Sequence, residues 1–271
     1  MNTLINSCKY VVNENIQNIY RIFCIVKYEI LAENRDSKFG MLWSVLDPLI
    51  QIFAYWFAFG IGIRGGKPVN GVEYINWMLV GLTPWFFLSA AIRKGTSSIH
   101  KKINIITKMK FPISILPTTV VFKELFNHVI MLAVIIIFIS INGVTLNLNS
   151  LSLIYYIFCA VVFSISLTMV TSVANMFTRD VGKAVNSSMR LLMFITPILW
   201  TMDKLPKWAV TVMKCNPLFY ITEGYRNSLL FNKSIFLYSK RMLVFWIIVI
   251  FLFSIGSLLM YKFKHKFIDL I

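Results

Sequence analysis

Two polar pairs stand out as residues whose types and spacing could do chemistry. Glu124 is followed four residues later by His128, and Lys123 by Asn127, inside a long apolar run. Residues four apart lie on one face of a helix, so the members of each pair could hydrogen-bond. A glutamate beside a histidine could relay protons, whereas a paired polar patch packed against neighbouring helices is the commoner arrangement in membrane proteins. Both interpretations are carried forward.

A glycine pattern that imitates a nucleotide-binding fingerprint fails in its context. Gly60, Gly62 and Gly65 spell GxGxxG. They end an apolar run and lead into Gly66-Lys67-Pro68, without the strand and helix that this fingerprint needs on either side. The chain also shows no paired aspartates of a metal-dependent membrane glycosyltransferase and no cluster of metal ligands. We therefore expect no nucleotide, cofactor or metal bound by this chain, and no enzymatic activity of the chain by itself.

Composition sets the class of protein. The 271 residues are 58% hydrophobic and 14% charged, with a mean hydropathy of +0.72, which excludes an ordinary soluble domain and indicates a multi-pass membrane protein. The formal charge of +16 comes from basic residues at the ends of apolar runs. Membrane orientation and anionic lipid explain that placement better than nucleic acid does. The four cysteines form no CxxC pair, so we expect neither a structural disulfide nor a zinc site.

Six apolar runs are predicted to cross the membrane as helices. They are residues 41–63, 74–92, 113–141, 151–176, 185–202 and 242–261. The apolar part of the fifth run is short and contains Pro197, so this helix either begins near Val185 or is partly re-entrant. Residues 203–241 contain too many apolar side chains for a solvated loop, and we expect short helices that dip into the outer leaflet and break at Asn216-Pro217.

The first 34 residues form a separate unit. Apolar side chains recur every three or four positions over residues 4–34, with charged and amide side chains between them. This pattern predicts an amphipathic helix in the membrane interface, followed by a transmembrane domain over residues 35–271.

A basic segment between the second and third predicted spans fixes the orientation. Six Lys or Arg lie between Arg93 and Pro112, and such clusters stay in the cytoplasm, which places both termini there as well. Ile99, Ile103 and Ile106 recur with helical spacing inside this segment. We predict a short amphipathic helix whose apolar face is buried by lipid or by a protein partner, against the alternative of a loop that only sets topology.

Aromatic residues make up 15% of the chain and crowd two of the predicted spans. The members singled out here are Tyr55, Trp56, Trp85, Phe86 and Phe87. Aromatic belts at the two membrane interfaces explain them in most membrane proteins. Because sugar rings stack on aromatic faces, an aromatic-lined conduit for carbohydrate is the alternative.

Several local motifs carry a family resemblance over nearly the whole chain. They are Phe39-Gly40-Met41-Leu42-Trp43 with Asp47-Pro48-Leu49-Ile50-Gln51, then Arg179-Asp180, Thr196-Pro197-Ile198, Asn216-Pro217 and Tyr225-Arg226. The series is similar to the permease subunits of type-2 ABC exporters for cell-surface polysaccharides. Tyr55-Trp56, Trp77 to Gly81 and Lys108-Met109-Lys110-Phe111-Pro112 resemble the wall teichoic acid branch of that family.

The resemblance implies a homodimer of six-helix permeases bound to two copies of a separate ATPase, which would hold ATP and magnesium. This complex of permease and ATPase would export an undecaprenyl-diphosphate-linked anionic glycopolymer across the bacterial plasma membrane. It further implies that Ile99, Ile103 and Ile106 enter a groove of the ATPase, that residues 4–34 form a gate helix, and that the segment after Pro197 is a re-entrant pair lining the pore. Four basic residues at the gate helix are then predicted to attract the lipid diphosphate: Arg21, Lys27, Arg35 and Lys38.

Three alternatives stay open. Within the same class, the substrate could be O-antigen or capsular polysaccharide. From other classes, the chain could be a membrane-embedded glycosyl- or acyltransferase, or a proton-coupled transporter that uses Glu124 and His128.

Overall fold

A computed structural model describes residues 2–33, 35, 38–63, 67–102, 111–235 and 239–263 of the chain, and these residues are almost entirely helical. In chain order the elements are α1 (Asn2–Gln17), α2 (Ile19–Glu33), η1 (Gly40–Leu42), α3 (Trp43–Tyr55), the π-helix η2 (Trp56–Ile63), α4 (Tyr74–Thr96), α5 (Ser98–Lys101), α7 (Ile115–Ile141), η3 (Leu148–Leu151), α8 (Ser152–Phe177), α9 (Asp180–Ile195), η4 (Met202–Lys204), α10 (Lys207–Lys214), α11 (Pro217–Leu229) and α12 (Ser239–Phe263). One isolated antiparallel bridge joins Val69 and Val72.

Five helical segments in the described part of the chain are long and apolar enough to cross a membrane. They are Gly40–Gly62, Tyr74–Thr96, Ile115–Ile141, Leu148–Phe177 and Ser239–Phe263, which match five of the six predicted spans. The sixth prediction, residues 185–202, falls on α9. This helix has 16 residues, about 24 Å of length, and its boundaries are shifted toward the N-terminus by several residues.

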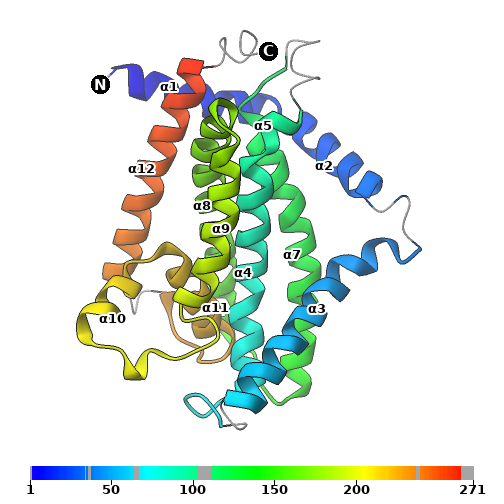
Figure 1. Cartoon of the computed structure of the whole chain (residues 1–271), viewed down its shortest axis with the longest axis vertical. Coiled ribbons are helices and arrows are strands. Elements are labelled where there is room, and N and C mark those ends of the chain that lie inside the picture. The colour runs from blue at the N-terminus through cyan, green and yellow to red at the C-terminus, as the bar shows by residue number, and fades with distance from the viewer. Residues whose placement is uncertain are drawn as a thin grey trace.

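Helix α4 is the centre of the bundle. In this helix 83% of the most apolar stretch is buried, against 11% in the first span. Helices α7, α8, α9 and α11 pack around α4, whereas α3 leans away from the bundle (Figure 1). Small side chains permit close packing at one contact: a Cβ on Gly95 would lie 2.5 Å from Thr168 Cγ2 of α8.

The N-terminal unit is two helices rather than the single predicted one. The helix is interrupted at Asn18, whose side-chain amide donates to the carbonyl of Glu14 at 2.8 Å. The backbone amide of Asn18 also donates to Glu14 at 3.2 Å, and that of Ile22 donates to Asn18 at 2.9 Å, so the interruption is confined to a single residue. Helices α1 and α2 lie across one end of the bundle (Figure 1), with α1 against α12 and α2 against α7. We call this the α1 end.

A buried arginine organises the opposite end. Arg226 of α11 is 1% exposed and its guanidinium lies 3.4 Å from the centroid of the Trp77 ring. It donates to the carbonyls of Pro197 at 3.0 Å and Ile198 at 2.6 Å, and to the carbonyl of Trp77 at 3.3 Å. Glu223 supplies a carboxylate at 3.7 Å. Arg226 therefore joins the segment after α9 to α4 and α11.

The start of α11 explains a second predicted boundary. The Asn216 side chain accepts a hydrogen bond from the Leu218 amide at 2.9 Å, and Pro217 occupies the first turn. Both are favoured helix-start features, because the amide of the first turn has no partner within the helix. Asn216 also donates to Thr196 at 3.3 Å, so the break between α10 and α11 is anchored to the turn after α9.

Candidate functional site

A cavity of about 540 Å³ lies between α3 and the central helices. Its walls come from α3, α4, α7 and α9, and Glu33 at the end of α2 reaches its rim. It collects many of the residues that the sequence singled out. These are Gly40, Trp43, Pro48, Tyr55, Trp85, Phe86, Phe87, Glu124 and His128.

The cavity wall is aromatic along α4. Trp85 and Phe87 are each only 3% exposed, so they form the packed part of the wall, whereas Phe86 is half-buried. Across the cavity, the hydroxyl of Tyr55 lies 3.5 Å from Met193 Sδ of α9. Trp56 is the exception among the predicted aromatics. It packs beside Phe53, with ring centroids 6.1 Å apart, and does not line the cavity.

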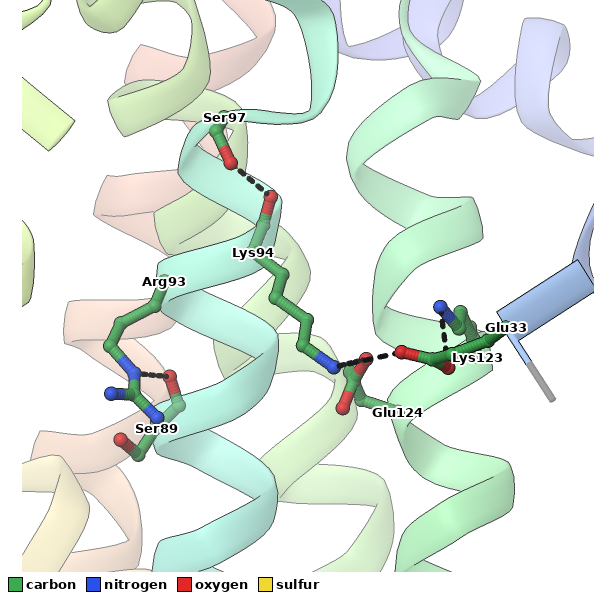
Figure 2. Close-up of polar contacts among 7 residues, drawn as sticks. All are labelled: Glu33, Ser89, Arg93, Lys94, Ser97, Lys123 and Glu124. Atoms are coloured by element: carbon green, nitrogen blue, oxygen red, sulfur yellow. Dashed lines mark hydrogen bonds and ion pairs between the residues drawn. The ribbon is translucent and has the colours of Figure 1, made fainter. Parts of the chain in front are cut away.

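A network of four charges lies at the rim of the cavity (Figure 2), where Glu33, Lys94 and Glu124 line the space and Lys123 adjoins Glu33 without lining it. Lys94 of α4 donates to Glu124 of α7 at 2.8 Å and lies 3.8 Å from Glu33, while Lys123 of α7 contacts Glu33 at 2.8 Å. Glu124 is 5% exposed and the Lys123 side chain 14%, so each is compensated by its partner. Burial raises the pKa of Glu33, but the Lys123 hydrogen bond and the charges of Lys123 and Lys94 outweigh it and lower the pKa overall. We call these four residues the rim network.

The rim network revises the interpretation of the polar pairs. Glu124 is bound to Lys94 of another helix, and the His128 imidazole Nε2 lies 2.8 Å from the hydroxyl of Tyr225. The imidazole is also enclosed by the rings of Phe87 and Tyr225, at centroid distances of 5.0 Å and 5.8 Å. Glu124 and His128 therefore bond across helices instead of to each other, as members of a packed polar patch.

The cavity wall holds further charged side chains that were not among the predicted site residues, although Asp47 belongs to one of the family motifs. Arg93 donates to the carbonyl of Ser89 at 3.1 Å, and Arg190 of α9 donates to Ser187 at 3.3 Å. Asp47 of α3 lines the same space. Arg93 was visible only as one of several basic residues in its segment, and no local pattern distinguished Arg190.

The remaining predicted site residues lie elsewhere. Arg21, Lys27, Arg35 and Lys38 are exposed and none of them lines the cavity, so their role at a lipid entrance stays a prediction. Arg179 and Asp180 sit at the exposed start of α9, where Asp180 pairs with Lys183 at 3.1 Å. Four predicted residues belong to the contacts around Arg226 described above, at the end of the bundle opposite the α1 end: Pro197, Asn216, Pro217 and Arg226.

Ile99 has a different environment from the predicted one. It is fully buried inside the chain, in a cluster with Val11, Leu116 and Met260. In this structure its side chain therefore belongs to the core, where α1, α7 and α12 meet. Ile103 and Ile106 lie outside the described residues, and the docking prediction for this segment now concerns those two side chains.

These helices define a multi-pass membrane protein whose bundle encloses a charged and aromatic cavity. The ABC-2 type transporter family matches the chain over residues 20–230, and the chain belongs to that family. The O-antigen export system permease protein RfbA of Klebsiella pneumoniae is 27% identical over 248 residues, covering 91% of this chain and 93% of that protein. The protein of the same name from Myxococcus xanthus is 26% identical over 207 residues, covering 76% of this chain and 78% of that protein.

Proposed function

We propose that this chain is the membrane-spanning permease subunit of an ATP-driven exporter for a lipid-linked cell-surface polysaccharide. The observation that carries the proposal is the cavity in a chain of the ABC-2 type transporter family. Its half-buried Phe86 and its exposed Trp43 offer faces on which sugar rings can stack, and Arg93 and Arg190 offer positive charge to an anionic polymer. The O-antigen permeases that match the chain over most of their length favour a polysaccharide.

The functional unit in this proposal is a homodimer. The first span exposes large apolar side chains, with Ile50 at 60%, Phe53 at 64% and Phe57 at 61% exposed. Lipid can cover such a face, and so can a second copy. Helix α3 forms one side of the cavity, and pairing two copies across this side would enlarge the cavity into a passage wide enough for a polymer chain.

The energy source in this proposal is a separate ATPase, present in two copies, that holds ATP and magnesium. Its docking surface is the segment with Ile103 and Ile106, on the cytoplasmic side of the bacterial plasma membrane with both termini. A substitution Ile103→Asp should leave the permease inserted but release the ATPase on purification, because a buried apolar contact is replaced by a charge. Replacing Lys101 by Gln should have a much smaller effect, since charges at the edge of an interface mainly alter association rates. Co-purification of the ATPase at normal stoichiometry with the Ile103→Asp permease would refute this docking site.

Two polymers have a specific observation in their favour. Wall teichoic acid is favoured by the Tyr55-Trp56, Trp77 to Gly81 and Lys108 to Pro112 motifs. O-antigen is favoured by the O-antigen permeases that match the chain at 26–27% identity. We place the anionic teichoic acid first, carried on undecaprenyl diphosphate, with Arg21, Lys27, Arg35 and Lys38 attracting the carrier to the membrane surface.

The test is export in a reconstituted system. The permease and its ATPase are placed in vesicles with an undecaprenyl-diphosphate-linked poly(alditol phosphate), or with a neutral O-polysaccharide on the same carrier. The polymer that reaches the far leaflet is measured by its cleavage with an added enzyme, a phosphodiesterase for the poly(alditol phosphate) or a glycosidase for the O-polysaccharide. We expect ATP-dependent export of the anionic polymer, and none with an ATPase variant that cannot hydrolyse ATP. Polymer synthesis by the permease alone would favour a transferase, and export abolished by a protonophore without added ATP would favour proton coupling.

A further inference from the structure

The rim network contains a carboxylate in an unfavourable place. Glu33 is the last residue of α2, where the negative end of the helix dipole disfavours a second negative charge. The last turn of α2 holds no basic residue to offset it. Its compensation comes from two lysines of other helices, Lys123 at 2.8 Å and Lys94 at 3.8 Å. Glu33 is therefore held by tertiary contacts against its local preference.

Lys123 needs an anion more than Glu33 needs Lys123. The Lys123 side chain is 14% exposed, while that of Glu33 is 46% exposed. A mostly buried ammonium without a counter-charge is costly, but a half-exposed carboxylate can return to water. Lys94 differs because its shorter contact, 2.8 Å, is with the buried Glu124. If Glu33 leaves, one positive charge remains uncompensated at the rim of the cavity.

The two ammonium groups also have the geometry of an anion site. They converge on one carboxylate at the cavity rim, with the Lys94 side chain extending from α4 toward Glu124 and Glu33 (Figure 2). Lysine binds phosphate as a mobile point charge. A phosphate or diphosphate carries more charge than a carboxylate and can accept hydrogen bonds from both ammonium groups.

The attachment of α2 depends partly on this contact. Helix α2 buries Ile22 and Val26 against α7 but exposes Tyr20, Phe23 and Tyr28. Its polar attachments include the ion pair of Glu29 with Lys102, one turn earlier, and the contacts of Glu33. Loss of the Glu33 contacts would free the carboxyl end of α2, while the apolar contacts of Ile22 and Val26 would hold the earlier part of the helix against α7.

We propose that Lys94 and Lys123 form a binding subsite for the phosphate head group of the lipid carrier, and that Glu33 occupies this subsite until the carrier displaces it. Displacement detaches the carboxyl end of α2 from the cavity rim. Binding of the head group therefore itself opens the entrance to the cavity. This inference rests on the proposed function for the identity of the ligand. It adds the residues that receive the head group and an internal carboxylate that competes for them.

The test compares two glutamates of the same helix. Glu33→Gln removes the competing charge, and Glu29→Gln is the matched control because Glu29 pairs with Lys102 and does not line the cavity. Binding is measured on the permease–ATPase complex in nanodiscs, with undecaprenyl diphosphate, uncharged undecaprenol and phosphatidylglycerol as probes. We expect Glu33→Gln to tighten undecaprenyl diphosphate binding about fivefold, Glu29→Gln to leave it within about twofold, and Lys123→Gln to weaken it.

A second measurement uses the unaltered rim network. Spin labels at Leu31 of α2 and Val129 of α7, both exposed, report the separation of the two helices in a chain whose native cysteines are replaced. Undecaprenyl diphosphate should lengthen this distance, and undecaprenol should not. The subsite is wrong if Glu33→Gln binds the diphosphate no more tightly than the parent, or if the diphosphate leaves the distance unchanged.

The outcomes separate this inference from the proposed function. A parent complex that exports polymer but shows no Glu33 dependence contradicts the subsite alone. A complex that neither binds the carrier nor exports polymer contradicts both. Equal Glu33 dependence for phosphatidylglycerol would show a general lipid-phosphate site and would overturn the assignment to the carrier.

Discussion

Gly81 and Arg226 should be energetically coupled. A Cβ on Gly81 of α4 would lie 2.2 Å from Nη2 of Arg226 and 2.8 Å from its Cζ. The guanidinium has little room to retreat, because it is fixed by three carbonyl groups and by the Trp77 ring. Overpacking of this kind costs about 1–3 kcal/mol. We therefore expect Gly81→Ala to destabilise the permease by that amount.

Arg226→Ala should cost more. A hydrogen bond from a charged group contributes roughly 1.5–3 kcal/mol, so the two shorter bonds, to the carbonyls of Pro197 and Ile198, contribute about 3–6 kcal/mol. Part of this is regained because no guanidinium has to be desolvated in the variant. A net loss of about 3–4 kcal/mol is the expected result.

The double variant distinguishes this reasoning from general damage to the bundle. If the clash with the guanidinium is the whole cost of Gly81→Ala, that cost disappears once the arginine is gone, and the two effects fail to add by about 1–3 kcal/mol. The assay is the midpoint temperature at which the purified permease loses its monodisperse elution, with shifts of roughly 2–4 °C per kcal/mol. Gly62→Ala serves as control, since its Cβ would meet only the Phe57 carbonyl oxygen, at 3.7 Å. Additive losses in the double variant would refute the coupling.

Three further outcomes follow from the structure. Phe86→Ala, which removes a half-buried ring of the cavity wall, should reduce export by several-fold. Phe251→Ala on α12, exposed and outside the cavity, should not, and equal effects would exclude a role for the cavity aromatics. A membrane-impermeant thiol reagent added outside should label the exposed Cys215 and spare Cys24, and the reverse pattern would invert the predicted orientation. The folded-state pKa of Glu33 is lowered, so its contribution to holding α2 is present above the ordinary glutamate pKa of about 4 and is lost as the pH falls through the folded value. The distance between the spin labels on α2 and α7 should therefore be constant from about pH 8 to 5 and increase below about pH 4. The Glu33→Gln variant should show no such change.

The spans were predictable because hydropathy over some twenty residues is a local property. Five predicted ranges agree with helices of the structure to within a few residues at most ends. The boundaries of α9 were not predictable from hydropathy, because its apolar core is short and its ends are set by contacts with other parts of the chain. Thr196 receives a hydrogen bond from Asn216, and Pro197 offers its carbonyl to Arg226, both from residues far along the chain.

The sequence allowed us to predict many of the residues that line the cavity, but not the hydrogen-bond partners of those residues. Aromatic and motif residues from α3 and α4 were singled out from the sequence, and most of them line one space. The partner of Glu124 was assigned by helical spacing to His128, but the carboxylate bonds to Lys94 on a neighbouring helix. Spacing along one helix says nothing about which helix packs beside it, and Ile99 illustrates the same limit, because an isoleucine stripe does not reveal which surface covers it.

The different burial of the first two spans has a consequence for how the protein is made. The two spans have nearly the same mean hydropathy, yet 11% of one and 83% of the other is buried. Insertion into the bilayer depends on hydropathy, so both helices should enter the membrane with equal ease. They differ afterwards: substitutions among the exposed apolar residues of α3 meet only lipid or another protein surface, whereas α4 must fit four neighbouring helices. Inherited or engineered changes should therefore accumulate on α3, and α4 should tolerate few, although the two helices insert into the membrane equally well.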